Sequence, residues 1–177
     1  DFFDHENDFE QVRDKLIIEL LYTTGMRRAE LISLKDHSID LSQSIVKVIG
    51  KRNKERQIPL LNSVRGTIDN YRILKKEIAP LTDHFFVTKK GEQIYPTLVY
   101  RIINEYFGKV SLKVKKSPHI VRHSFATHLL NEGADLNSVK ELLGHSSLAS
   151  TQVYTHSNLK DLKLMYNRAH PRSNKNH

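Results

Sequence analysis

The chain has no cysteine among its 177 residues. Disulfides, thiolate chemistry and cysteine-type zinc sites are therefore excluded, and the absence fits a cytoplasmic location without requiring one. No apolar run approaches the roughly 20 residues that cross a bilayer, so no membrane partner is expected. Internal repeats and low-complexity stretches are also lacking. The remaining composition, 38% apolar and 27% charged, is that of an ordinary globular protein long enough to bury one full core.

Acidic residues are in the minority. The chain has 20 Asp and Glu against 28 Lys and Arg, a formal net charge of +8 and a pI near 9.6. This excess suggests a polyanionic partner, although a merely basic domain explains the charge alone equally well. The positions of the basic residues favour the partner. They cluster at 50–56, 72–76, 89–90 and 109–116, several in turns where a folded domain presents them together to a phosphate backbone.

The first part of the chain reads as two helices and a hairpin. Apolar residues recur at helical spacing over 8–22, and Gly25 is a natural stop for that helix. A second helix is predicted to begin near Arg27. The β-branched run 44–49 and the short run 56–60 predict two strands, joined by a hairpin loop over the six residues between them.

Helical spacing returns over 61–79 and again from Pro96 to about Gly108. A second small hairpin is predicted between these helices, pairing 85–87 with 93–95 across a Lys-Lys-Gly turn. The elements so far predict a mainly α domain with a small antiparallel sheet.

The last third of the chain carries clear helix boundaries. Ser117 and Pro118 form an N-cap and first-turn pair, and Gly133 ends that helix. Asp135 caps a helix that ends at Gly144. A further helix is predicted to carry Tyr154, and an apolar stripe predicts a final helix over 159–170.

Four short segments carry side chains suited to chemistry on a phosphate. They are TGMRRAEL (24–31), GKRNKER (50–56), PHIVRH (118–123) and LLGHSSLASTQVYTH (142–156). Their candidate site residues are Arg27, Glu30, Lys51, His119, Arg122, His145 and Tyr154.

The residue types alone leave other interpretations open. Tyr154 could be an ordinary core tyrosine, although its polar neighbours argue against that. The histidines could suggest a metal site, but the chain has no H-E-x-x-H helix and no carboxylate cluster beside them, so no metal is expected. Lys51 and Lys54 are equivalent loop charges as far as composition shows.

In this order and spacing, the four segments resemble the catalytic domain of the tyrosine recombinases, in particular the Xer type. An isolated H-x-x-R has no specificity, whereas LGHSSLASTQVYTH is a strong signal, and the resemblance runs from about Phe9 to Arg172. It implies the α+β fold of that domain over 1–177. It also implies site-specific cleavage and rejoining of DNA strands through a 3′-phosphotyrosyl intermediate, without metal, ATP or other cofactor.

The resemblance assigns a role to each matching position. Tyr154 is the nucleophile, and its phenol needs help because its ordinary pKa is about 10. His119 accepts the phenol proton, and Lys51 protonates the departing 5′-oxygen. Arg27 and Arg122 bind the non-bridging phosphate oxygens. Two further positions have assisting roles: His145 hydrogen-bonds the phosphate and Glu30 supports the first arginine or the histidine base.

Four more basic residues are expected to contact DNA: Arg28, Arg52, Lys54 and Arg56. Relatives commonly have glycine where Arg52 stands, so this arginine is expected to stiffen the hairpin loop slightly and to add a phosphate contact.

The family pattern also has parts beyond this chain. Members carry an N-terminal helical domain that clamps DNA, and we expect this chain to be the catalytic domain of a longer protein. Their C-terminal helix, 159–170 here, docks on a neighbouring protomer. The partners implied are duplex DNA with a two-armed recombination site and further copies in a homo- or hetero-tetramer, in a bacterial cytoplasm. Chromosome dimer resolution is the role expected of the Xer type, and the alternatives are an integrase of a mobile element or phage and a type IB topoisomerase.

Overall fold

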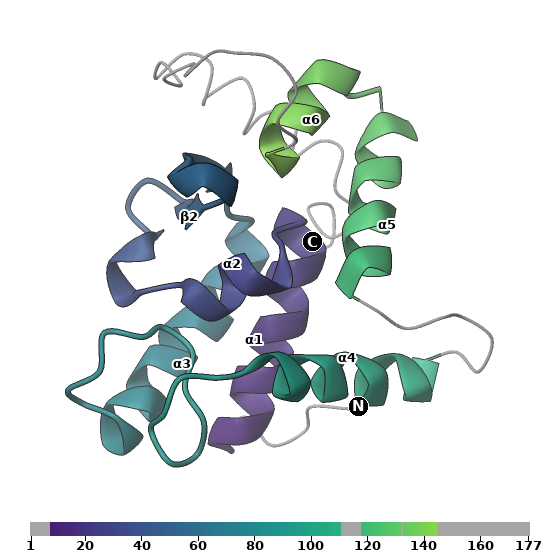
Figure 1. The fold of residues 1–177 in the computed structure, drawn as a ribbon. Coiled ribbons are helices and arrows are strands. Elements are labelled where there is room, and N and C mark those ends of the chain that lie inside the picture. Colours follow the sequence, from purple (N-terminus) through teal and green to yellow (C-terminus); the bar gives the residue numbers. More distant parts are fainter. Residues whose placement is uncertain (1–7, 111–117, 132, 145–177) are drawn as a thin grey trace.

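The structure is a computed structural model that describes residues 8–110, 118–131 and 133–144, with residues 107–110 and 118–121 described by their helical backbone alone. These residues form a helical domain with one small antiparallel sheet (Figure 1). The mainly α architecture with a minor sheet, predicted from the sequence, is confirmed.

Helix α1 (Phe9–Thr24) lies at the centre and contacts α3, α4 and α5 (Figure 1). Asp8 caps its start, since the Asp8 carboxylate accepts a hydrogen bond from the backbone N–H of Glu10 at 2.9 Å. Gly25 ends it in the left-handed conformation, with φ of 62°. Burial is complete for Leu16, Ile17 and Leu20, because neighbouring elements cover most sides of this helix.

The sheet follows α2 (Arg28–Ser33) and the short 3₁₀ helix η1 (Asp36–Ser38), and its strand order is β1-β2-β3. Its strands are β1 (Ile39–Asp40), β2 (Ile45–Ile49) and β3 (Glu55–Pro59), and both pairings are antiparallel. The predicted hairpin is therefore confirmed, with the 3₁₀ turn η2 (Lys51–Asn53) in its loop. Strand β1 was not predicted, because two residues carry no periodic signal.

Helix α3 (Asn62–Ile78) packs along α1 and carries Tyr71 into an aromatic cluster. The Tyr71 ring lies 5.5 Å from that of Phe85 and 5.4 Å from that of Phe86, centroid to centroid. Its hydroxyl accepts a hydrogen bond from the backbone N–H of Val87 at 3.0 Å. These contacts tie the segment after α3 to the core.

That segment forms the predicted second hairpin only in part, with backbone hydrogen bonds from Thr88 to Glu92 and from Ile94 to Phe86. A single bridge joins Val87 to Gln93, and no ladder extends from it. The Lys-Lys-Gly turn does form, since the backbone N–H of Gly91 donates to the carbonyl of Thr88 at 2.9 Å. Phe85 instead donates its backbone N–H to Leu34, so the strand-like residues are used in packing against the α2 end.

Three helices complete the described domain: α4 (Pro96–Val110), α5 (Pro118–Asn131) and α6 (Leu136–Leu143). Helices α5 and α6 contact each other, and α5 also packs on α1 (Figure 1). Asp135 caps α6 and Gly144 ends it with φ of 67°, as the sequence predicts. The predicted helices that carry Tyr154 and 159–170 lie outside the described residues.

Candidate active site

Arg27 stands at the start of α2, where Glu30 holds it by both backbone and side chain. The backbone N–H of Arg27 donates to Glu30 Oε2 at 2.7 Å, and Arg27 Nη1 donates to Glu30 Oε1 at 2.9 Å. A glutamate at the third helical position reaching back to the N-cap is half of a capping box. Glu30 is therefore in direct contact with Arg27, while its role in supporting the first arginine or the histidine base stays a prediction.

Arg56 on β3 binds the same carboxylate from the other side. Its Nη1 donates to Glu30 Oε1 at 2.6 Å and its Nη2 to Glu30 Oε2 at 2.9 Å, a two-pronged ion pair. Both side chains are buried, with 8% of Arg56 and 3% of Glu30 exposed. Burial by itself raises the pKa of Glu30, but hydrogen bonds from Arg56 and Arg27 outweigh it and hold the pKa below its usual value.

The position of Arg56 corrects one expectation. The sequence predicts a DNA contact here, but the Arg56 guanidinium lies inside the protein, and its Nε also donates to the carbonyl of Leu142 at 2.8 Å. All three of its nitrogens thus have protein acceptors. The sequence did hold a signal: in the strand 56–60, alternation puts Arg56 on the same inward face as Ile58.

Arg122 on α5 reaches the same region from the opposite side. Its Nη1 donates to the carbonyl of Gly25 at 2.7 Å, and its Nη2 donates to the carbonyl of Leu143. Burial, together with the nearby charges of Arg27 and Arg56, lowers the pKa of Arg122 to about 10. The group is therefore still charged at neutral pH. Because burial and like charges destabilise its positive form, a nearby anion would stabilise it more than it stabilises an ordinary arginine.

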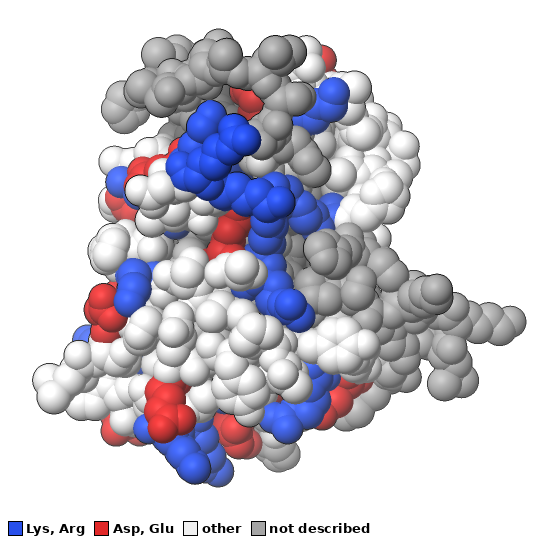
Figure 2. All heavy atoms as spheres, in the orientation of Figure 1, with Lys and Arg blue, Asp and Glu red and all other residues white. Residues whose placement is uncertain are grey.

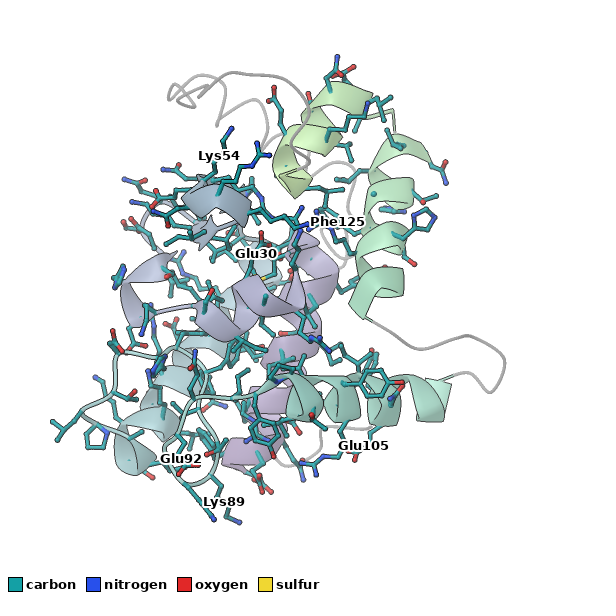
Figure 3. All side chains as sticks on the ribbon, viewed as in Figure 1. Glu30, Lys54, Lys89, Glu92, Glu105 and Phe125 are labelled. Carbon is teal, nitrogen blue, oxygen red and sulfur yellow. The ribbon has the colours of Figure 1, made fainter. Side chains whose placement is uncertain are left out.

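The C-terminal end of α6 is the point where the three arginines meet. Three consecutive carbonyls there each accept from one arginine: Leu142 from Arg56, Leu143 from Arg122, and Gly144 from Arg27 at 3.1 Å. The last carbonyls of a helix lack helical partners and carry partial negative charge, which suits a guanidinium. Figure 3 shows Glu30 between the hairpin and α5, beneath this end of α6.

The other basic candidates lie on the outside of the same region. Lys51, Arg52 and Lys54 on the hairpin loop are exposed, as is Arg28 on α2. Figure 2 shows Lys and Arg side chains in a continuous band over the hairpin and the start of α2. Arg52 adopts φ of 60° and ψ of 29°, the left-handed conformation that glycine adopts without strain.

Three further candidates lie at the edge of the described residues or outside them. The backbone of His119 lies in the first turn of α5, three residues before Arg122, but its side chain is not among those described. His145, which follows Gly144 directly, and Tyr154, further along the chain, both lie outside the described residues. The structure therefore brings together Arg27, Glu30 and Arg122, with Lys51 on the adjacent loop.

The described part of the chain has neither a cluster of metal ligands nor a membrane-spanning helix. No group of three His, Asp or Glu side chains within 8–110, 118–131 and 133–144 is placed to hold a metal ion. Of the helices formed by these same residues, none has the length and apolar character needed to cross a membrane.

Residues 2–161 match the model of the phage integrase family, so the chain belongs to this family. It is 44% identical over 173 residues to tyrosine recombinase XerC of Chlorobaculum tepidum, covering 93% of this chain and 51% of that protein. The crystal structure of XerA recombinase superimposes with a TM-score of 0.73 at 32% identity, covering 92% of this chain and 60% of that one.

A second solved structure adds a ligand to the comparison. XerH site-specific recombinase bound to its difH substrate, in a pre-cleavage complex, superimposes with a TM-score of 0.73 at 29% identity over 88% of this chain and 47% of that one. The chain spans about half the length of the curated relatives that it matches.

Proposed function

We propose that this chain is the catalytic domain of a site-specific tyrosine recombinase of the Xer type. The observation that carries the proposal is the convergence of Arg27 and Arg122, far apart in sequence, on the adjacent carbonyls of Gly144 and Leu143. Two guanidiniums with planar donor forks at one point fit the non-bridging oxygens of a phosphodiester. Family membership and the similarity to Xer recombinases support the same function.

The proposed reaction is a transesterification, in which one phosphoester bond breaks as another forms. The phenolic oxygen of Tyr154 attacks the scissile phosphorus, and the bond from phosphorus to the 5′-oxygen breaks. His119 takes the phenol proton, and Lys51 gives a proton to the departing 5′-oxygen, which leaves as a hydroxyl. Attack by a 5′-hydroxyl on the phosphotyrosyl bond reverses the sequence, so no ATP is consumed.

Arg27, Arg122 and His145 stabilise the phosphate while its charge builds up in the transition state. A guanidinium has five N–H donors, so Arg27 can keep Glu30 while turning others to a phosphate oxygen. Burial first, and then the charges of Arg27 and Arg56, lower the pKa of Arg122, and an incoming phosphate anion offsets the repulsion among these arginines.

Duplex DNA is the proposed substrate, with Arg28, Arg52 and Lys54 as contacts to its backbone. The exposed positions of these three side chains and the basic band of Figure 2 support the assignment. The XerH structure with its DNA substrate supports it from the comparisons. In the assembly we propose, four copies meet on paired sites in the bacterial cytoplasm, and the segment 159–170 docks on a neighbouring copy.

Resolution of chromosome dimers is the role we propose, supported by the 44% identity to a tyrosine recombinase XerC. An integrase of a mobile element is the second candidate, favoured by the description of the matching family as phage integrases. The two share the chemistry and differ in the sites they join.

Trapping of the covalent intermediate tests the proposal. Wild-type protein and Tyr154→Phe are incubated with nicked duplexes that the wild-type protein has selected from a randomised pool, and the products are denatured and analysed by gel and mass spectrometry. We expect an adduct at Tyr154 in the wild type and none in Tyr154→Phe, with DNA affinity nearly unchanged. Adduct formation by Tyr154→Phe, or loss of the wild-type adduct with EDTA, contradicts the proposed chemistry.

A further inference from the structure

The buried pair of Arg56 and Glu30 lies where three chain segments meet. These segments lead to Arg27, to Lys51 and to His145, which the proposed function places around one phosphate. We infer that Arg56 is a positioning residue for that reaction: it holds the end of α6 and the Glu30 carboxylate in place while Arg27 and Arg122 bind phosphate. The inference rests on the proposed function and gives Arg56 a role in place of a DNA contact.

The first link runs from Arg56 to Arg27 through a shared carboxylate. Each Glu30 oxygen accepts one bond from each arginine: Oε1 from Arg56 Nη1 at 2.6 Å and Arg27 Nη1 at 2.9 Å, Oε2 from Arg56 Nη2 at 2.9 Å and the Arg27 backbone at 2.7 Å. Removing the Arg56 fork leaves the carboxylate held from one side only. The Glu30 carboxylate can then move, and the Arg27 guanidinium that it binds is no longer held in one orientation.

The second link runs from Arg56 to the residues just before His145. Arg56 Nε holds the carbonyl of Leu142 at 2.8 Å, and the guanidinium also lies against the backbone of Gly144. A Cβ at Gly144 would lie only 3.0 Å from Arg56 Nη1 and 3.1 Å from its Cζ. The last turn of α6 thus packs directly against the Arg56 guanidinium.

A third contact concerns the base of the hairpin loop. A Cβ at Gly50 would lie 3.4 Å from both Arg56 Nη1 and Glu30 Oε1, so the backbone that leads into Lys51 passes close to the ion pair. The Gly50 N–H donates to the carbonyl of Lys54 at 2.8 Å, which closes the loop above it.

Arg56 differs from the other two arginines of the cluster because the proposed reaction does not require it to bind phosphate. Arg27 and Arg122 also hold α6 carbonyls, and both must turn donors toward the substrate. The Arg56 side chain is 8% exposed, and its nitrogens donate to Glu30 and Leu142. It is therefore the arginine that keeps its hold on α6 when the others change partners.

The test separates positioning from ordinary stabilisation by comparing the Arg56–Glu30 pair with a second ion pair whose cation is buried, although its carboxylate is half-exposed. Arg56→Lys keeps the charge beside Glu30 but cannot reproduce the fork and the bond to Leu142 together. Lys75→Met is the matched control, because Lys75 is 4% exposed and binds Asp36 at 2.7 and 2.8 Å on the α3 side of the molecule. Thermal unfolding, DNA affinity and the single-turnover rate of adduct formation at saturating DNA are measured for each.

For Arg56→Lys we expect near wild-type DNA affinity and salt dependence, with a single-turnover rate lowered about tenfold to a hundredfold, as misplacement by about an ångström produces. Lys75→Met is expected to keep the wild-type rate at a temperature where both variants are folded. Arg56→Met is expected to be slower still, and to be interpretable only where its circular dichroism spectrum matches the wild type.

Two outcomes overturn the inference. A wild-type rate in folded Arg56→Lys shows that the position serves stability alone. A weaker affinity with a salt slope smaller by about one and an unchanged rate at saturation shows a direct phosphate contact. Both results require that wild-type protein forms the Tyr154 adduct; absence of that adduct refutes the proposed function instead, so the two failures are distinguished.

Discussion

The ring of Phe125 on α5 lies against the backbone of Gly25 at the end of α1. A Cβ at Gly25 would lie 2.4 Å from Phe125 Cδ1, closer than any real contact, and Gly25 has φ of 62°. Figure 3 shows Phe125 pointing from α5 toward this end of α1. The carbonyl of Gly25 in turn accepts a hydrogen bond from Arg122 Nη1 at 2.7 Å. The close approach of α5 to Gly25 therefore helps to position Arg122 in the candidate site.

Gly25→Ala is therefore expected to lower the free energy of unfolding by about 2–4 kcal/mol, the sum of left-handed strain and overpacking. Urea denaturation measures it. Gly66→Ala is the matched control, because Gly66 lies inside α3 with nothing within 4 Å of its would-be Cβ. That change is expected to stabilise by about 0.5–1 kcal/mol. A neutral Gly25→Ala contradicts the close contact with Phe125.

Arg52→Gly is expected to raise the free energy of unfolding by about 0.5–1 kcal/mol. Arg52 has φ of 60°, where a side chain costs about 1–2 kcal/mol, and part of this gain is offset by the greater freedom of glycine in the unfolded chain. Lys54→Gly is the control, since Lys54 has an ordinary φ of −82° and is expected to lose stability. Equal losses in both variants would show that the loop is not strained at Arg52.

Asp14 on α1 should make stability depend on pH between about 4 and 6. Burial raises the pKa of Asp14 to about 6; Arg13 opposes the shift, and Glu10 and Glu105 add to it. The folded pKa lies above the unfolded value of about 3.9, so the stabilisation is present in full below that value and is lost as pH rises through 6.

Asp14→Asn mimics the protonated acid and is expected to stabilise by roughly 1–2 kcal/mol at pH 7.5 and by nearly nothing at pH 4. Urea titrations at both pH values measure the difference. Asp40→Asn should show the opposite trend, because hydrogen bonds from Ser42 and Gln43 lower the pKa of Asp40. A loss of stability in Asp14→Asn at pH 7.5 would mean that its 2.8 Å ion pair with Arg13 outweighs burial.

Arg27→Lys is expected to slow DNA cleavage about a hundredfold with little change in DNA affinity. Lysine keeps the charge but cannot hold Glu30, Gly144 and a phosphate oxygen with one planar fork. Arg101→Lys, at an exposed position on α4 to which no role is assigned, is the control and should cleave at the wild-type rate. Single-turnover adduct formation distinguishes them, and equal rates would remove Arg27 from the proposed mechanism.

Local signals in the sequence were sufficient for most of the helices and for the hairpin. Glycines at the ends of α1 and α6 and the cap at Asp135 mark boundaries because they act on their own backbone, whatever surrounds them. The pairing predicted for 85–87 with 93–95 formed only in part, as the Val87–Gln93 bridge and the hydrogen bonds beside it. Phe85 packs against Tyr71 and donates its backbone N–H to Leu34, and contacts with such distant residues leave no local pattern in the sequence.

The candidate site likewise has a part that the sequence predicts and a part that depends on tertiary packing. Residue types in order along the chain are a property of sequence, and through the resemblance to the tyrosine recombinases they predict Arg27, Glu30 and Arg122 as site residues. Which arginine faces phosphate and which faces the interior depends on how β3, α2 and α6 pack, because burial and partner choice are settled by distant segments. Only the tertiary structure could turn Arg56 from a surface charge into the buried partner of Glu30 and Leu142.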